Sequence, residues 1–343
     1  MKNQIKHFLL LAIMACSSLL SAQSAVQYME KITKEFNKIS EETWDYTRAV
    51  AHKKQGKLIE NKRKEMLNAN RSALNRIKNM QPFKGDASYR DSTVRYLELS
   101  YMVLNNDYSK IVDMEEISEQ SYDAMEAYMT AQELANDKLE AAFEVASKAQ
   151  KDFAAQNNIN LVENDSKTAE KLEKASEVFK YYNKIYLAFF KPYKQEIYLI
   201  EALSKGDVNG MKQNQESLSK LSKEAITKIK AIQAYKNNTT LKVNVTDVLE
   251  FYIMEADKKI PLLVDFMMKK EKFDKLKAVM DKKGQSASKS EIDEYNAAIK
   301  EMNATSNGFN NINNELNNKR AHVLDTWNNS VSRYLDKNVS NKK

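Results

Sequence analysis

Apolar residues recur at intervals of three and four along most of the chain. Ile32, Phe36 and Ile39 form one such series, and Ala73 and Ile77 belong to another. This spacing places apolar side chains on one face of an α-helix. The 343 residues include only 3 prolines and 6 glycines, which leaves few turn residues for a β-rich or α/β fold. The pattern therefore predicts an all-α protein of long amphipathic helices.

Breaks in this periodicity divide the chain into expected helices and connections. The helices are expected near residues 25–54, 57–80, 92–117, 119–157, 169–205, 208–235, 244–282 and 288–337. A polar linker over 157–167 separates the two groups of helices. We therefore predict two tandem antiparallel helical-bundle repeats of about four helices each, over 23–165 and 166–343. One unbroken packing of all the helices is the alternative.

The two halves are similar to each other in sequence. With a shift of 152 residues, residues 72–114 align with 224–266 without a gap, and ten of the 43 pairs are identical. Self-similarity of this kind is typical of an internal duplication. The abundance of lysine and leucine in helices can also imitate a repeat.

The alignment also predicts local features. Pro261 lies within an expected helix, and a proline inside a helix costs about 3 kcal/mol. We expect a kink there and loosened structure at the matching Asn-Asn-Asp of residues 105–107. Gly56 and Gly206 fall between the first and second helices of their halves, where a glycine suits a left-handed helix terminus.

The N-terminal segment, 1–22, has the layout of a secretory signal peptide. Lys2 and Lys6 give a positive start, an apolar stretch follows over 8–14, and small residues end at Ala22. This stretch is shorter than the roughly 20 apolar residues that span a bilayer, and no later segment is long and apolar enough. We expect an exported protein, periplasmic, surface-located or secreted, with a mature chain beginning near Gln23.

Cys16 is the only cysteine. Residues 13–16, Ile-Met-Ala-Cys, are loosely similar to a lipobox, but the apolar region continues past the cysteine. Cleavage after Ala22 is our prediction, and an outer-membrane lipoprotein with lipid on Cys16 is the alternative. Cleavage after Ala22 would leave no cysteine, so buried apolar surface would have to stabilise the fold.

Charge excludes some classes of partner. The formal net charge is +7 and 29% of the residues are charged, with both signs mixed along the chain. No basic run interleaved with aromatic residues occurs outside the C-terminal lysines, so we expect no nucleic-acid partner. Association with an anionic membrane surface is a weaker alternative, because acidic residues offset the scattered lysines.

A polar cluster in the first half is a candidate ligand site. Spacings of three and four place an acid, a base and a histidine on one helical face beside a tryptophan, and an Arg-Asp pair in the next connection could complete the site. Its members are Trp44, Asp45, Arg48, His52, Arg90 and Asp91. The alternative is an ordinary surface pair, Asp45 with Arg48, beside a core tryptophan.

The densest carboxylate stretch, residues 113–126, is a second candidate. Asp113, Glu116 and Asp123 form one helical stripe that could bind a cation or a basic partner. Such a run is also typical of the solvated face of an amphipathic helix.

Motifs for catalysis and for metals are missing from the sequence. It has no nucleophile elbow, phosphate loop or Gly-x-Gly-x-x-Gly, and no Glu-x-x-His step. After cleavage the chain would keep only His52 and His322, which lie in different halves. We therefore predict no catalytic residue, no metal and no cofactor.

Three segments carry a resemblance to a known family. Residues 42–47 (Glu-Thr-Trp-Asp-Tyr-Thr), 89–92 (Tyr-Arg-Asp-Ser) and 111–117 (Ile-Val-Asp-Met-Glu-Glu-Ile) are similar to a family of exported, all-helical bacterial surface proteins of uncharacterised function. The similarity extends over the mature chain. It implies an envelope or surface location and an all-helical fold, and it carries over no site residues.

These features favour a non-enzymatic protein of the cell envelope or surface with a binding or structural role. The expected partner is an envelope or surface protein or a polymer, because long helical bundles present rigid faces of mixed charge. The alternative is a ligand- or metal-binding bundle, possibly an enzyme, that uses the polar cluster of the first repeat.

Overall fold

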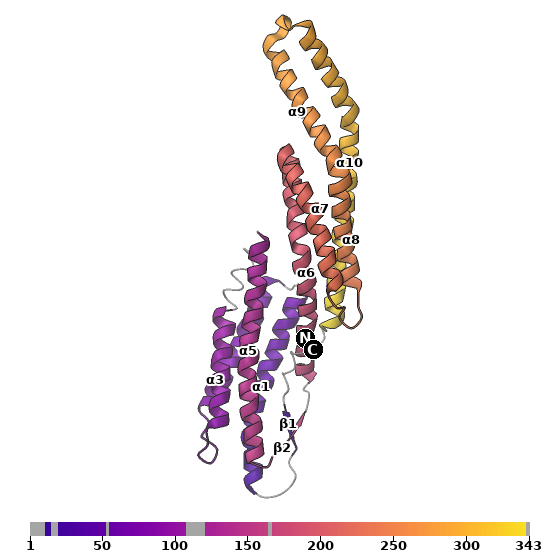
Figure 1. Ribbon diagram of the computed structural model, residues 1–343. Coiled ribbons are helices and arrows are strands. Elements are labelled where there is room, and N and C mark those ends of the chain that lie inside the picture. Colours follow the sequence, from indigo (N-terminus) through magenta and orange to yellow (C-terminus); the bar gives the residue numbers. More distant parts are fainter. Residues whose placement is uncertain (1–10, 15–19, 53–54, 108–120, 164–166, 341–343) are drawn as a thin grey trace. The chain divides into compact units, whose positions relative to one another are not determined.

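The computed structural model describes residues 11–14, 20–52, 55–107, 121–163 and 167–340 (Figure 1). The predicted all-α class is confirmed. The long helices are α1 (Leu20–Ala51), α2 (Gly56–Lys78), α3 (Ser88–Met102), α5 (Tyr122–Gln156), α6 (Lys167–Lys205), α7 (Val208–Ala231), α8 (Thr240–Met254), α9 (Ile260–Lys283) and α10 (Lys289–Asn338).

Several short elements join these helices. Two π-helical turns, η1 (Val103–Asp107) and η2 (Glu255–Lys259), follow α3 and α8, and a 3-10 turn, η3 (Gly284–Ser286), joins α9 to α10. Strands β1 (Leu11–Met14) and β2 (Asn160–Glu163) pair antiparallel. The sequence predicted a leader and a polar linker in these two segments, and no strand.

The chain forms two compact units. Unit 1 consists of Met1–Tyr181 and Ser332–Lys343, and unit 2 consists of Tyr182–Val331. These bounds differ from the expected division at 165/166 because α6 and α10 each contribute residues to both units.

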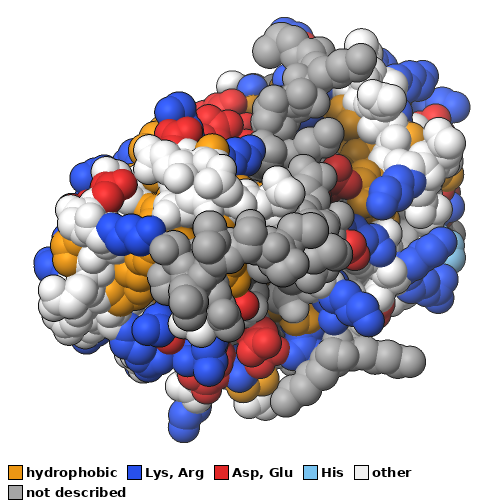
Figure 2. All heavy atoms as spheres, turned by 90° about the horizontal axis from the view of Figure 1, so that it is seen from below, with side chains coloured by type: hydrophobic (Ala, Val, Ile, Leu, Met, Phe, Trp, Pro, Cys, Tyr) orange, Lys and Arg blue, Asp and Glu red, His pale blue; other side chains and the backbone are white. Residues whose placement is uncertain are grey.

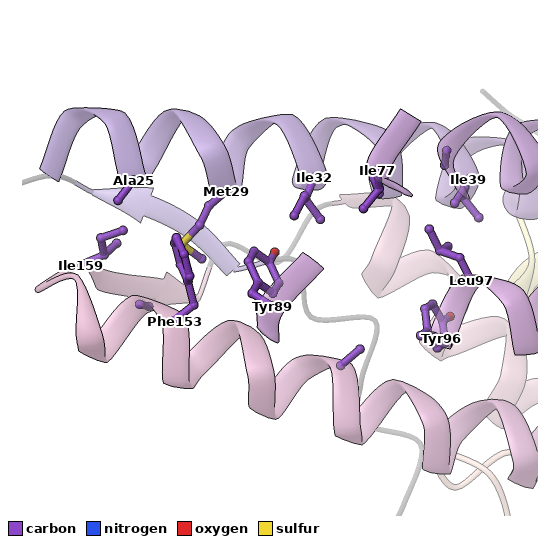
Figure 3. Close-up of a cluster of buried hydrophobic side chains, with 13 residues drawn as sticks. Ala25, Met29, Ile32, Ile39, Ile77, Tyr89, Tyr96, Leu97, Phe153 and Ile159 are labelled. Atoms are coloured by element: carbon purple, nitrogen blue, oxygen red, sulfur yellow. The ribbon is translucent and has the colours of Figure 1, made fainter. Parts of the chain in front are cut away.

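The core of unit 1 lies between α1, α2, α3 and α5 (Figure 3). The ring of Phe153 lies 5.3 Å from those of Phe83 and Tyr89, centroid to centroid. Of the apolar positions that the periodicity predicted, Ile32, Ile39, Ala73 and Ile77 are buried and Phe36 is partly buried. Each fully buried aliphatic side chain of this size contributes about 1.5–3 kcal/mol.

The core of unit 2 is built from α6, α7, α8, α9 and α10. Its large, fully buried side chains include Ile185, Phe190, Leu199, Met211, Leu218, Ile229 and Tyr252. On α10, Trp327 is buried with its ring 5.6 Å from that of Phe189. Aromatic side chains of α6 and α10 therefore meet in this core.

Local structure recurs at positions that the sequence alignment of the two halves pairs. Helix α8 begins and ends at the positions that match the two ends of α3, and η2 likewise matches η1. An isolated bridge joins Phe83 to Asp86, and a second joins Tyr235 to Asn238. The side chains of Asp86 and Asn238 accept hydrogen bonds from the backbone N–H two residues on, at 2.8 and 2.9 Å. The tandem arrangement of two whole bundles remains a prediction.

The structure tests the predicted breaks directly. A π-helical turn, η1, includes residues 105–107, where loosened structure was expected. Pro261 lies in the first turn of α9, directly after η2, and not inside one continuous helix as predicted. Gly206 has a positive φ of 67°, as expected. The prediction for Gly56 was wrong, because this residue begins α2.

None of the helices in the described ranges is both long and apolar enough to cross a membrane. The face of the molecule shown in Figure 2 carries lysine and arginine side chains interspersed with aspartate and glutamate. This mixing of signs agrees with the pattern along the sequence.

Candidate functional site

The predicted polar cluster is only partly assembled, at the C-terminal end of α1. Asp45 forms an ion pair with Arg48 and a second with Lys62, whose Nζ lies 3.3 Å from Asp45 Oδ2. Burial acts to raise the pKa of Asp45, but hydrogen bonds from Arg48 and Lys62 outweigh it and lower that pKa. Trp44 is buried, with Lys171 Nζ 5.6 Å from its ring centroid. The pair is partly buried, with 12% of the Arg48 side chain and 25% of the Asp45 side chain exposed, and it lies beside a buried tryptophan.

His52 binds the C-terminal end of α10. Its Nδ1 lies 2.7 Å from Asp336 Oδ1, and its Nε2 lies 2.9 Å from the Val339 carbonyl oxygen. Asp336 belongs to α10 and Val339 follows its last residue. His52 therefore links α1 to α10 within unit 1.

Arg90 and Asp91 lie far from these residues. Arg90 donates to the Met80 carbonyl at 2.8 Å and pairs with Asp91, also at 2.8 Å. Both charges act on Tyr28, near the start of α1. Tyr28 is 17 residues before Asp45, about 25 Å along a helix. The structure therefore divides the predicted cluster between the two ends of α1.

The remaining predictions concern the acidic stripe and the cysteine. Asp113, Glu116 and Cys16 lie outside the described residues. Asp123 is exposed in the first turn of α5, where an acidic side chain suits the helix dipole. Among the residues described, no group of three or more His, Cys, Asp or Glu side chains could hold a metal ion.

The most unusual polar site is a buried cluster in unit 2, which the sequence analysis missed. Arg320 of α10 donates from Nε to Glu196 of α6 and from Nη2 to Glu255 of η2. The side chain of Glu255 is 0% exposed and that of Glu196 is 3% exposed. Two carboxyl groups therefore share one guanidinium, and we call these three residues with Tyr252 the ionic cluster.

Two polar atoms of the ionic cluster are buried without a hydrogen-bond partner among the described residues. They are Glu255 Oε2 and the hydroxyl oxygen of Tyr252. An unpaired buried polar atom costs about 1–3 kcal/mol. These two unpaired atoms therefore lower the stability of unit 2.

Burial dominates the electrostatics of the ionic cluster. It raises the pKa of Glu255 to about 7, an effect that Arg320 opposes and Glu196 reinforces. Burial also raises the pKa of Glu196, against the attraction of Arg320. The pKa of Tyr252 is raised by burial and by both carboxylates, so its hydroxyl keeps its proton.

The elements around the ionic cluster fix its geometry. Glu255 is the first residue of η2, and π-helical turns often occur at functional sites. Pro192 lies inside α6, four residues before Glu196. Asn317 Oδ1 accepts a hydrogen bond from Arg320 Nη1 at 2.6 Å. The guanidinium carbon lies 5.9 Å from the ring centroid of Phe251.

A surface groove of about 330 Å³ lies between α8 and α10 and shares Phe251 with these contacts. Asp247 and Glu250 lie on its α8 side, and Lys319 and His322 lie on its α10 side. Its full lining is Asn244, Asp247, Glu250, Phe251, Met254, Lys319, His322, Val323 and Thr326. Its size is at the lower end of the range for small-ligand pockets, and it offers both signs of charge.

The sequence did contain a signal for the ionic cluster. Glu255 continues the buried series of Val248 and Tyr252 at steps of four and three. Arg320 likewise lies between the buried Leu316 and Val323. A charged residue on an apolar helical face must be paired or neutral, because an isolated buried charge is costly. A search for such positions would have found the cluster.

Comparison of the chain with protein-family models, with curated proteins and with solved structures found no match in any of the three.

Proposed function

We propose that this chain is a non-enzymatic binding or structural protein of the bacterial cell envelope, exported by its N-terminal leader. One observation carries the proposal: the charged side chains that could form a reactive site bind one another between helices. Arg320 joins α6 to η2, and His52 joins α1 to α10. Such contacts stabilise the helix arrangement and leave outer helical faces of mixed charge for recognition.

The groove between α8 and α10 is a part of unit 2 that suits recognition. Its acidic side would contact a cationic group, its basic side would contact an anionic group, and Phe251 and Val323 supply apolar surface. This combination suits a segment of an envelope protein or a charged polymer.

The experiment is capture of partners from envelope fractions by the mature protein. Glu250→Lys reverses a charge in the groove, and Glu294→Lys makes the same change at an exposed position of α10 outside it. We expect the first variant to lose the partner and the second to retain it. Equal capture by both variants would place recognition elsewhere, and reproducible turnover of a substrate would overturn the non-enzymatic assignment.

Export is tested by the mature N-terminus and mass of the native protein. A chain beginning at Gln23 without lipid fits the periplasmic, surface or secreted form. A lipid on Cys16 would instead support the tethered alternative and direct the search to partners near that membrane. An intact Met1 would contradict export.

A further inference from the structure

We propose that the ionic cluster of unit 2 is a proton-binding site, in which Glu255 takes up one proton and thereby sets how firmly α6, η2 and α10 pack together. The proposed proton site lies within unit 2 and does not depend on the identity of an envelope partner. With both carboxyl groups ionised, Glu196, Glu255 and Arg320 would carry one uncompensated negative charge.

The surroundings of Glu255 make that extra charge unfavourable. The Glu255 side chain is 0% exposed, so water does not solvate it. Its Oε1 accepts from Arg320, while its Oε2 has no hydrogen-bond partner in the part of unit 2 that is described. A proton on Oε2 removes the uncompensated charge and leaves the hydrogen bond from Arg320 to Oε1 in place.

The neighbouring elements offer few other charges to Glu255. Arg320 and Glu196 are the charged groups that act on it. Tyr252 and Tyr193 face the same cluster as titratable hydroxyls. The residues of α7 that are buried in unit 2 are uncharged, namely Met211, Leu218, Ser219, Ser222, Ala225 and Ile229.

Two of the three other charged residues of η2 form ion pairs at its partly exposed side, and the third, Lys258, is exposed. Asp257 pairs with Lys223 of α7 at 3.0 Å, and Lys259 pairs with Glu315 of α10 at 2.8 Å. These pairs are partly exposed, so solvent screens them. They hold η2 against α7 and α10 without neutralising Glu255. Burial of that carboxyl in the folded protein, and its pKa of about 7, point to protonation at mildly acidic pH.

Binding of the proton by Glu255 stabilises the folded form of unit 2. The folded-state pKa of Glu255 lies above its usual 4.5, so the proton stabilises unit 2 fully below about pH 4.5. That stabilisation is lost as the pH rises toward 7. Between those values Glu255 makes the unfolding equilibrium constant of unit 2 increase roughly tenfold per pH unit, and above pH 7 its contribution is flat.

The two tryptophans allow each unit to be followed separately. Trp327 is buried in unit 2 and Trp44 in unit 1, and the chain has no other tryptophan. In the full mature chain, Trp44→Phe leaves fluorescence from unit 2 alone, and Trp327→Phe leaves it from unit 1 alone. Urea unfolding from pH 4.5 to 8.5 then gives the pH dependence of each unit.

The key variant is Glu255→Gln, which mimics the protonated side chain and cannot ionise. We expect it to remove the roughly tenfold-per-unit dependence seen with Trp327 and to leave the signal of Trp44 unchanged. Asp257→Asn, in the same turn but exposed, is the matched control and should keep the dependence. Infrared difference spectra should show a protonated carboxyl band at pH 6 in the wild type and none in Glu255→Gln.

Two results would overturn the proposal. One is an unchanged pH dependence of unit 2 in Glu255→Gln. The other is a protonated carboxyl band at pH 6 that persists in this variant, because another group would then hold the proton. If Glu255→Gln unfolds at every pH, the infrared comparison of wild type with Asp257→Asn between pH 5 and 8.5 decides instead. Absence of a titrating carboxyl band in both would then reject the site.

Discussion

The two π-helical turns share a backbone conformation but enclose different chemistry. Val103 begins η1 and is 0% exposed in a small apolar cluster with Ala135. Glu255, at the matching position of the second half, begins η2 and is equally buried, but it binds Arg320. Widening of a helix by one residue therefore does not require a charged group. The charges of unit 2 are an addition to a turn that apolar packing can also stabilise.

A second pair of matching positions shows the same contrast. In unit 1, Asn70 Nδ2 donates to Ser100 Oγ at 3.1 Å, and both residues are buried. The matching residues of the second half are Ser222 and Tyr252, and each has a buried hydroxyl without a hydrogen-bond partner in the described chain. Asn70 Oδ1 is likewise buried without a partner among the described residues, so unit 1 differs at these positions by the hydrogen bond between Asn70 and Ser100.

The largest effect should come from Arg320→Met. It leaves two carboxyl groups buried without their shared partner, so we expect a loss of about 3–5 kcal/mol in the free energy of unfolding of unit 2 at neutral pH. Urea unfolding followed at Trp327 measures this loss. Lys319→Met, at the exposed neighbouring position, should change it by less than about 0.5 kcal/mol. A small effect of Arg320→Met would show that the two carboxyl groups find other partners or take up protons.

The reverse experiment introduces the charge into unit 1. Val103→Glu places a carboxyl group in the cluster around η1, which is aliphatic except for Tyr128: its other members are Leu99, Ala131, Ala135 and Leu139. We expect a loss of about 3 kcal/mol in unit 1, measured at Trp44. Val103→Gln should cost less at pH 8 than Val103→Glu does. Full stability of both variants would mean that η1 is solvated, contrary to its burial.

Replacement of the three charged residues of the ionic cluster by apolar ones tests whether apolar packing alone can stabilise η2, as it does η1 in unit 1. The triple variant Glu196→Leu, Glu255→Leu and Arg320→Met removes all three charges together. Such exchanges are often neutral or stabilising by about 1–4 kcal/mol. Thermal unfolding at pH 8 should therefore show no loss of stability, in contrast to Arg320→Met alone. A loss as large as that of the single variant would indicate that the site is required for folding.

The smallest predicted effects concern the matching polar pair. Asn70→Ala leaves the Ser100 hydroxyl without its donor, and we expect a loss of about 1–2 kcal/mol in unit 1. Ser222→Ala removes a hydroxyl that already lacks a partner, so unit 2 should change by less than about 0.5 kcal/mol. The midpoints of urea unfolding, followed by the fluorescence of Trp44 for unit 1 and of Trp327 for unit 2, measure the two losses of stability. Equal losses would show that Ser222 is bonded through ordered water.

Local periodicity was sufficient to predict the helices but not the polar sites. The breaks at Pro261 and at residues 105–107 followed from backbone chemistry and a sequence repeat, and both lie beside or within a π-helical turn. The structure does not bring the residues of the predicted polar cluster together, and the reason is physical. Sharing a helical face brings Asp45 and Arg48 together, but it does not bring Arg90 closer, because that depends on where the next helices cross α1.

The ionic cluster was missed for the opposite reason: its residues are far apart in the sequence but lie together in the fold. Glu255 lies 59 residues after Glu196, and Arg320 lies 65 residues after Glu255 and 124 after Glu196. No short motif therefore contains them. What the sequence does contain is the placement of each charge in an apolar series, which predicts burial but not the partner. Identification of the partner requires the packing of α6, η2 and α10.

The division of the chain has a consequence for how the protein is completed during synthesis. Residues 332–340 belong to unit 1, where Asp336 and Val339 bind His52. Unit 2 is therefore an insertion within a discontinuous domain, and all its residues leave the ribosome before the last segment of unit 1 does. The contacts of His52 with Asp336 and Val339 span more than 280 residues of chain, so they should form last in unit 1, whereas its core of α1, α2, α3 and α5 need not wait for them. A chain truncated after Val331 would then lose these contacts while the core of unit 1 and unit 2 stay folded.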